Sequence, residues 1–362
     1  MDSRIYIYAL FLIAYFILSQ NGDNKKNVTT FAKFCCFILF LESGLRHANV
    51  GPDTPTYYMS FLDIRTESFS ILLDRYYDAY VLGIAKDPTY PIIVKLFSSV
   101  IDSWQLFLLF AAWIYFYALY KFLTRYVKDM KGMLLAFTFC ISLFHIIPLS
   151  GIRQQFTMAI AMLLPPLIED KKMIKFLVVV LVGSTIHISL LLVTPLYFLY
   201  HYFTGHSRLF VVLAFLCMPI ISFLAKDILG ALTSFMANDY YTGYTTNDET
   251  SGAFMYILFF ALIVFISIYY YDKADFNDQR LYCSALMMIS LTVPLIVVNG
   301  AMIRISQYFT IYSMAFLPYI IKRTNNKFVY YGTLGALLFL TFKGSFDYHF
   351  FWENIVLNFE YR

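Results

Sequence analysis

Charged residues are scarce in this sequence. Asp, Glu, Lys and Arg make up 14% of its 362 residues, whereas soluble domains average about 25%. Hydrophobic residues reach 60%, and long apolar runs recur along the whole chain. A membrane barrel would instead show alternating segments of about ten residues. The composition therefore predicts an all-α polytopic integral membrane protein and excludes an ordinary soluble domain.

Motifs of soluble chemistry are also missing. The five cysteines lie in apolar segments without CxxC spacing, so we expect neither disulfides nor a metal site. The chain contains no P-loop and no GxGxxG motif, and we expect no bound nucleotide and no cofactor. The net charge of +4 is spread over many short loops, which leaves no basic face for nucleic acid.

Hydropathy predicts about 12 transmembrane helices in one domain that covers residues 1–345, followed by an external tail at 346–362. The predicted spans are 4–20, 28–45, 104–122, 132–149, 153–168, 173–185, 186–203, 208–225, 253–271, 281–299, 303–321 and 328–342. The run at 88–102 is short and carries Lys95. We therefore expect a re-entrant or interfacial helix there.

The orientation follows from the positions of Lys and Arg. These residues cluster in the loops near 25–33, 121–131, 169–175 and 322–327, and such loops face the cytoplasm. The larger connections, at about 46–103 and 226–252, are then external. Because the cytoplasmic loops are too short to fold a nucleotide-binding domain, we expect any chemistry on the external side.

Four polar stretches open on the predicted external side. They are GLRHANVGPDTPTYY (44–58) with Arg46, Asp53 and Tyr57, SGIRQQ (150–155) with Arg153 and Gln154, STIHIS (184–189) with His187, and RISQYF (304–309) with Arg304, Gln307 and Tyr308. Arginine is scarce on that side of membranes, so three arginines at helix ends indicate an anionic partner. Guanidinium groups bind phosphate oxygens in pairs. A lipid diphosphate fits such a site.

Structural explanations stay open for these residues. An arginine at a helix end can snorkel to the membrane surface or pair with a carboxylate. His187 can be a satisfied interior histidine, and Asp53 can cap the turn that Gly51 and Pro52 begin. The tyrosine-rich loop at 238–252 can stack on sugar rings or belong to an interfacial aromatic belt.

In their order along the chain, these stretches, together with DPTYPIIVKLF (87–97), resemble the EpsG family of polysaccharide polymerases, relatives of the Wzy-type O-antigen polymerases. The resemblance covers about residues 1–345 and departs at Pro52, where the family has a small or hydroxyl residue. It implies a GT-C-like fold and a glycosyltransferase of the bacterial inner membrane with a periplasmic or external active site. Such enzymes transfer a glycan from undecaprenyl diphosphate to the non-reducing end of a lipid-linked repeat unit of O-antigen, capsule or exopolysaccharide.

Roles for the residues follow from this chemistry. We expect Arg153 and Arg304 to stabilise the leaving diphosphate without a metal, and Asp53 or His187 to take the proton of the acceptor hydroxyl. The residues expected to bind substrate are Arg46, Tyr57, Gln154, Gln307 and Tyr308. Membrane lipid and a chain-length regulator protein are further expected partners. The alternative is a flippase of the same lipid-linked oligosaccharide, which should expose polar residues to both sides.

Overall fold

The structure is a computed structural model that describes residues 2–20, 22–202, 207–235, 253–271, 280–324, 326–343 and 346–355. Every regular element in these ranges is a helix, and the β pairing within them is one isolated bridge between Arg46 and Phe350. The predicted all-α class is confirmed. Contacts divide the chain into unit 1 (1–72, 89–163 and 325–362) and unit 2 (73–88 and 164–324). The expectation of a single membrane domain stays a prediction.

Three described helices are long and apolar enough to cross a membrane. They are Trp104–Tyr126, Arg208–Ala231 and Arg280–Val297. Other apolar helices have 10–17 residues, among them Ser3–Ser19 and Lys327–Phe342. These helices agree with an integral membrane protein, whereas the number of about 12 spans stays a prediction.

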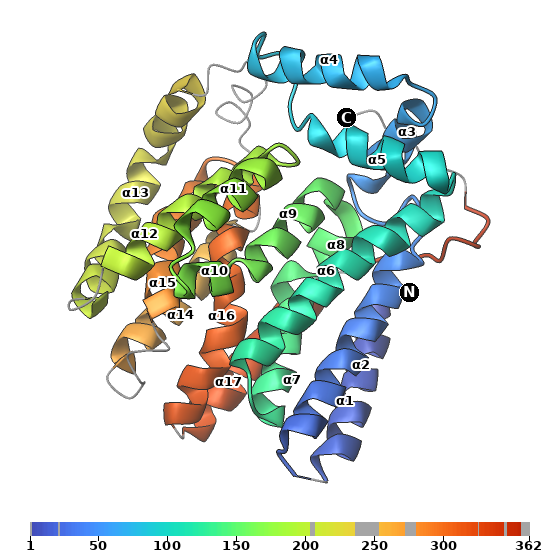
Figure 1. The fold of residues 1–362 in the computed structure, drawn as a ribbon. Helices are drawn as coiled ribbons and strands as arrows, with labels where there is room; N and C mark the ends of the chain where they lie inside the picture. Colours follow the sequence, from blue (N-terminus) through green and yellow to red (C-terminus); the bar gives the residue numbers. More distant parts are fainter. Residues whose placement is uncertain are drawn as a thin grey trace. The chain divides into compact units, whose positions relative to one another are not determined.

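In unit 1, helix α2 (Lys25–Gly44) packs against α1 (Ser3–Ser19) and α6 (Trp104–Tyr126), as Figure 1 shows. The turn between α1 and α2 is fixed by its polar residues. Gly22 has a φ of +80°, and the side chain of Asn24 accepts a hydrogen bond from the backbone of Asn27 at 2.8 Å. Asparagine at this position is a preferred N-cap. The described residues 22–24 therefore lead the chain from one helix into the next.

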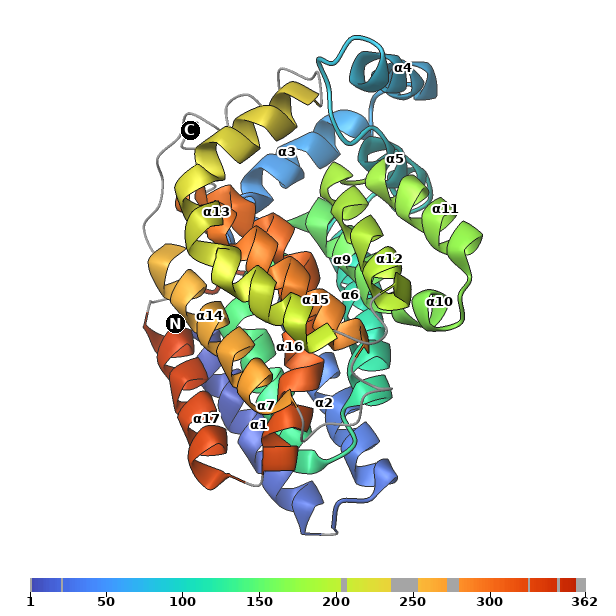
Figure 2. The ribbon, with the colours of Figure 1, turned by 90° about the vertical axis from the view of Figure 1, so that its left-hand side faces the viewer.

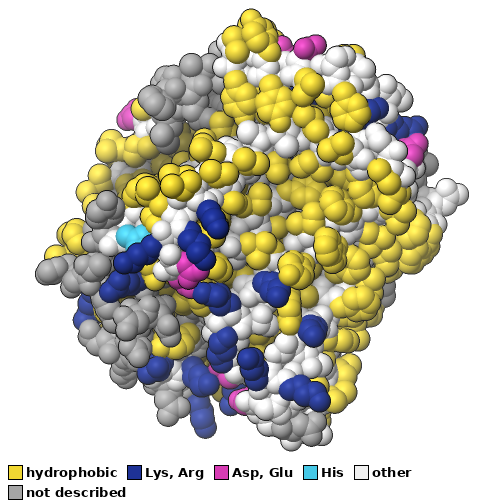
Figure 3. Space-filling model, in the orientation of Figure 1, with side chains coloured by type: hydrophobic (Ala, Val, Ile, Leu, Met, Phe, Trp, Pro, Cys, Tyr) yellow, Lys and Arg dark blue, Asp and Glu magenta, His cyan; other side chains and the backbone are white. Residues whose placement is uncertain are grey.

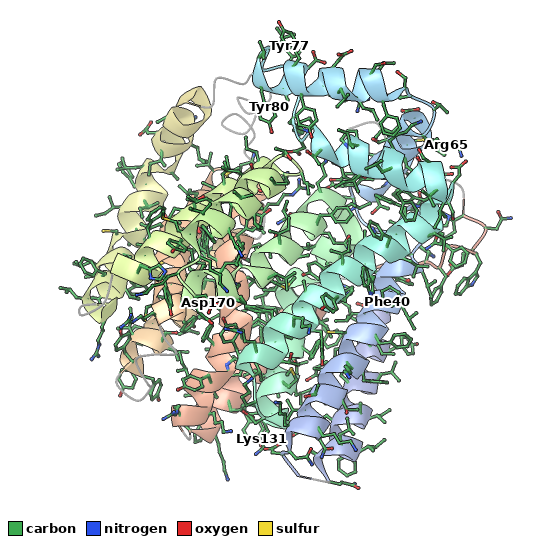
Figure 4. All side chains as sticks on the ribbon, viewed as in Figure 1. Phe40, Arg65, Tyr77, Tyr80, Lys131 and Asp170 are labelled. Atoms are coloured by element: carbon green, nitrogen blue, oxygen red, sulfur yellow. The ribbon has the colours of Figure 1, made fainter. Side chains whose placement is uncertain are left out.

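The basic loops of unit 1 lie together at one end of its helices. The side chain of Asp23 accepts a hydrogen bond from the backbone of Met130 at 3.1 Å, and Tyr330, in α17 (Lys327–Phe342), donates to the carbonyl of Lys131 at 3.4 Å. Arg65 marks the other end, where it pairs with Asp102 just before α6 (Figure 4). Within unit 1, the loops predicted to be cytoplasmic thus lie at the same end of the helices.

Apolar side chains cover much of the outer face over α6 and α5 (Thr89–Val100), drawn in yellow in Figure 3. Trp113 is 58% exposed and Val100 is 84% exposed. Large exposed apolar areas are unusual on soluble monomers but suit contact with lipid chains. This face of unit 1 fits a membrane environment.

The predicted external connection at 46–103 is largely helical. It contains α3 (Thr54–Ile64), α4 (Phe69–Tyr80) and α5, and α5 coincides with the short helix predicted at 88–102. The structure therefore confirms a helix at this position, while its interfacial or re-entrant location stays a prediction.

The predicted span at 132–149 is not one regular α-helix. Helix α7 (Met130–Phe139) continues as a π-helix, η1 (Cys140–Phe144), and then as α8 (Ile146–Ser150). Gly151 separates α8 from α9 (Ile152–Leu163). A short helix, α10 (Pro165–Glu169), follows after Leu164.

In unit 2, α15 (Arg280–Thr292) packs against α13 (Ser207–Phe235), α12 (Thr194–Tyr202) and α16 (Ile303–Thr324), and α14 (Ala253–Tyr269) also contacts α13, α15 and α16 (Figure 2). Helix α13 continues to Phe235, although a loop was predicted from residue 226. The sequence KDILGALTSF carries enough helix-forming residues to extend the helix past the charged pair Lys226 and Asp227. The tyrosine-rich stretch at 238–252 lies outside the described residues.

Candidate functional site

The turn that contains Asp53 packs directly on the segment that precedes Arg153. The backbone N–H of Asp53 donates to Oγ of Ser150 at 2.9 Å, and Oγ1 of Thr54 donates to the carbonyl of Leu149 at 2.9 Å. Gly51 has a φ of +88°, and a Cβ at this position would lie 2.5 Å from that same carbonyl. Only glycine fits this approach. Two polar stretches that lie about 100 residues apart in sequence are therefore joined in unit 1.

Arg153 lies against two tyrosine rings. Its Nε donates to the hydroxyl of Tyr57 at 3.3 Å, and its Cζ lies 5.4 Å from the centre of the Tyr57 ring and 5.6 Å from that of Tyr90. The two rings meet edge to face at 5.5 Å. Both distances from Cζ are within the range of cation–π contacts. The guanidinium is thus held in place at the start of α9, and it stays partly exposed.

The sequence-based interpretation missed Tyr90. Its side chain is 3% exposed, and its hydroxyl has no hydrogen-bond partner among the described residues. Tyr90 lies in the DPTYPIIVKLF stretch, which resembles the family's sequence. No cation stands beside Tyr90 in the sequence, so nothing indicated its contact with an arginine. Only the fold brings Tyr90 to Arg153.

Asp53 begins α3 without capping it. It occupies the N-cap position, yet its side chain makes no capping hydrogen bond to the described first turn. Asp53 therefore does not cap α3 through its side chain, and its role as a base stays a prediction. Gln154, one residue beyond Arg153, is 5% exposed.

Arg46 differs most from the sequence-based picture of a cation at the membrane surface. Its side chain is 0% exposed. Its Nη1 donates to the backbone and side-chain oxygens of Ser43, whereas Nε and Nη2 have no hydrogen-bond partner within the described part of the chain. Burial lowers the pKa of Arg46 to about 10, so the group is still protonated at neutral pH. Its expected contact with substrate stays a prediction.

The C-terminal segment pairs with the backbone on both sides of Arg46. The backbone N–H of His47 donates to the carbonyl of His349 at 2.8 Å, and that of Phe351 donates to the carbonyl of Leu45 at 3.0 Å. The bridge between Arg46 and Phe350 lies between these two hydrogen bonds. The described part of the predicted tail is therefore paired with the segment that carries Arg46.

His187 stands at a helix break in unit 2. Helix α11 (Met173–Ser184) ends before it, and the 3₁₀-helix η2 (Ile188–Val193) follows, while His187 itself is extended, with φ −158° and ψ 115°. Nδ1 of His187 lies 3.1 Å from Oδ2 of Asp87, and Oδ1 of Asp87 accepts the backbone N–H of Ile188 at 3.2 Å. Apart from its place at the start of the DPTYPIIVKLF stretch, nothing in the sequence pointed to Asp87.

A second helix break in unit 2 precedes Arg304. Asn299 is extended and caps η7 (Gly300–Met302) through a hydrogen bond from Ala301 at 2.8 Å. Helix α16 then begins with Arg304, which is partly exposed, in its first turn. Oγ of Ser189 donates to the hydroxyl of Tyr308 at 3.1 Å. The structure thus joins the segment after His187 to the helix that carries Arg304.

The nine predicted site residues divide between the two units. Arg46, Asp53, Tyr57, Arg153 and Gln154 belong to unit 1, and His187, Arg304, Gln307 and Tyr308 belong to unit 2. Gln307 and Tyr308 are 2% and 0% exposed, so both face the interior of unit 2. Among the described residues, no three His, Cys, Asp or Glu side chains gather in a possible metal site.

Comparison with known proteins adds the family. The family model described as the EpsG family matches residues 29–357. No curated protein and no solved structure matches the chain. The matched range contains all four polar stretches and both helix breaks. The chain belongs to the EpsG family, the Wzy-like family of polymerases of surface polysaccharide repeat units.

Proposed function

We propose that this protein polymerises lipid-linked oligosaccharide repeat units at the external face of a bacterial inner membrane, with undecaprenyl diphosphate as the carrier of the donor glycan. The observation that carries the proposal is Arg153. Its guanidinium is held by Tyr57 and Tyr90 at the start of α9. A fixed guanidinium at a helix N-terminus is suited to bind a diphosphate.

The two units each offer one such arginine. Arg304 also lies in the first turn of a helix, and it is partly exposed, like Arg153. Backbone N–H groups and the helix dipole favour negative charge at this position. In our proposal each of these arginines is a candidate to stabilise the charge that develops on the leaving diphosphate, and no metal is needed.

The reaction is a displacement at the anomeric carbon of the donor. The acceptor oxygen forms a bond to this carbon, and the bond to the diphosphate oxygen breaks with its electron pair. The hydroxyl proton passes to a base, for which the candidates are Asp53 in unit 1 and His187 in unit 2. The products are an elongated glycan on the acceptor lipid and free undecaprenyl diphosphate.

The test is to reconstitute purified protein in liposomes with undecaprenyl-diphosphate-linked repeat units. We expect a ladder of longer glycans, and we expect it to persist when EDTA is added. Translocation of the lipid across the bilayer without elongation would show a flippase and would overturn the proposal. A strict requirement for a divalent cation would overturn the metal-independent mechanism.

A further inference from the structure

We infer that Asp87 is a positioning residue that orients His187, and that this pair makes His187, rather than Asp53, the base for the acceptor hydroxyl. The inference rests on the proposed function, because it names the group that accepts the proton in that reaction.

The contacts define which ring nitrogen is available. Both carboxylate oxygens of Asp87 face donors on the same short segment, namely Nδ1 of His187 at 3.1 Å and the backbone N–H of Ile188 at 3.2 Å. An ionised carboxylate only accepts hydrogen bonds, so Nδ1 carries the proton. Nε2 of the neutral ring is then left as the acceptor, which is the form that a general base requires.

Asp87 is more deeply buried than His187, as we expect for a positioning residue and the base that it orients. The Asp87 side chain is 1% exposed, whereas that of His187 is 20% exposed. A carboxylate in the interior is costly unless donors compensate it, and here the helix break provides two. The ring therefore has a fixed inner partner while part of it remains accessible. A histidine with only a structural role, whose hydrogen bonds are all made in the interior, would not need an accessible ring.

The backbone of Asp87 is itself unusual. Its φ of 55° lies in the left-handed region, which non-glycine residues seldom adopt, and Pro88 follows it. Proline disfavours the right-handed helical conformation in the residue before it, and aspartate tolerates the left-handed one. Strained residues of this kind cluster at functional sites. The DP pair thus presents the carboxylate at one fixed position.

Charged groups of the neighbouring elements also bear on the pair. The elements that pack against η2 are α11, α12 and α16. Of the polar groups at the start of α16, Arg304 is cationic and Tyr308 is bonded to Ser189. Lys86 lies beside Asp87 in the sequence. Asp87 is the acidic side chain in contact with the His187 ring, and it stabilises the imidazolium during the reaction.

In the proposed step, the proton of the acceptor hydroxyl passes to Nε2 as the oxygen bonds to the anomeric carbon. The diphosphate leaves with the electron pair of the broken bond. Asp87 stays ionised and stabilises the positive charge on the ring. The imidazolium then gives its proton to water, which restores the base for the next transfer.

The test compares Asp87→Asn with Asp170→Asn, which removes an exposed carboxylate of the same unit that pairs with Lys172. The His187 titration is followed by ¹⁵N NMR of histidine-labelled protein, and polymerisation is followed over pH. Asn lacks the negative charge, so we expect His187 to titrate at lower pH in Asp87→Asn. The acid limb of the pH–rate profile should also move to lower pH, and the maximal rate should fall by roughly 100-fold. Asp170→Asn should change none of these.

The outcomes separate the inference from the proposed function. An active wild-type protein whose His187 titration is the same in Asp87→Asn would overturn the inference alone. Full activity of His187→Gln at wild-type abundance would do the same, because a glutamine cannot accept the proton. A wild-type protein that does not elongate the glycan would overturn both.

Discussion

The carboxylate of Glu42 lies 2.9 Å from Nε2 of His145, and both side chains are buried in unit 1. Oγ of Ser3 donates to the same carboxylate at 2.6 Å, and the hydroxyl of Tyr348 donates to the backbone carbonyl of Glu42 at 2.6 Å. The pair thus joins the start of α1, the end of α2, the residue before α8 and the C-terminal segment. This cluster lies beside α8, the helix on which the Asp53 turn packs.

Removing His145 should destabilise the protein. In His145→Ala the buried Glu42 side chain loses its ring partner, and a buried polar group that loses its hydrogen bond costs about 1–3 kcal/mol. We expect a clearly lower melting temperature for the purified protein in detergent. The control is Asp102→Ala, which breaks the exposed pair with Arg65 and should cost at most about 1 kcal/mol. Equal shifts in the two variants would contradict a supporting role for the buried pair.

Arg153→Lys should lose most polymerising activity while the protein still inserts. An ammonium on a flexible stem cannot reproduce the planar contact of a guanidinium, and loss of one preorganised donor costs about 100-fold or more in rate. The measurement is polymer length in cells beside membrane abundance. Arg125→Lys, in the last turn of α6, is the matched control and should behave like the wild type. Full-length polymer from Arg153→Lys would argue that this side chain only snorkels.

Tyr90 should act through its ring rather than its hydroxyl. The hydroxyl has no hydrogen-bond partner among the described residues, whereas the ring contacts Arg153. We therefore expect Tyr90→Phe to keep activity and stability, and Tyr90→Ala to lower both. Steady-state rates and melting temperatures of the two variants check this expectation. Strong loss in Tyr90→Phe would mean that the hydroxyl binds substrate.

Gly51→Ala should weaken the join between the Asp53 turn and α8. The φ of +88° is strained for alanine, and the new Cβ would lie 2.5 Å from the carbonyl of Leu149. Gly332→Ala is the control, because it stands inside a helix and no neighbouring atom lies within 4 Å of the position that its Cβ would take. Thermal unfolding should place Gly51→Ala below the wild type and Gly332→Ala at or above it. The reverse order would contradict this packing.

Arg46→Met should show whether the buried charge of Arg46 destabilises the protein. Burial lowers the pKa of Arg46 in the folded protein to about 10, below the value of 12.5 for a free side chain. The cost of burying the charge is therefore fully present below pH 10 and is relieved only as the pH rises above it. At pH 7 we expect Arg46→Met to melt at the wild-type temperature or higher, because a methionine carries no such cost. A large fall in melting temperature would show that the buried charge is compensated.

Much of the helical architecture was predictable, because apolar runs and the polar residues between them are local features of the sequence. The SGIRQQ stretch predicted a helix start, and α9 begins at Ile152. The partners of the site were not predictable. Asp87 meets His187 across 100 residues of sequence, and Tyr57 meets Arg153 across 96. Hydropathy carries no information about such contacts.

The burial of Arg46 was missed for a related reason. Residues 346–355 return to pair with Leu45 and His47, on either side of Arg46. The sequence of this tail suggested only an external end. The length of α13 was missed because a charged pair resembles a helix end in a hydropathy profile, although a lysine is a good helix former. Both differences come from contacts or propensities that an apolar window does not measure.

The π-helix Cys140–Phe144 makes the length of this stretch matter more than its composition. Such a turn accommodates one residue more than an α-turn, and each residue of an α-helix rotates the chain by about 100°. Deleting one residue from the π-turn would convert it into an α-turn and would leave His145 facing Glu42 and Ser150 facing the Asp53 turn. The same deletion in α7 would rotate both contacts by about 100°, so the position of a deletion, rather than the side chain removed, decides whether the two contacts persist.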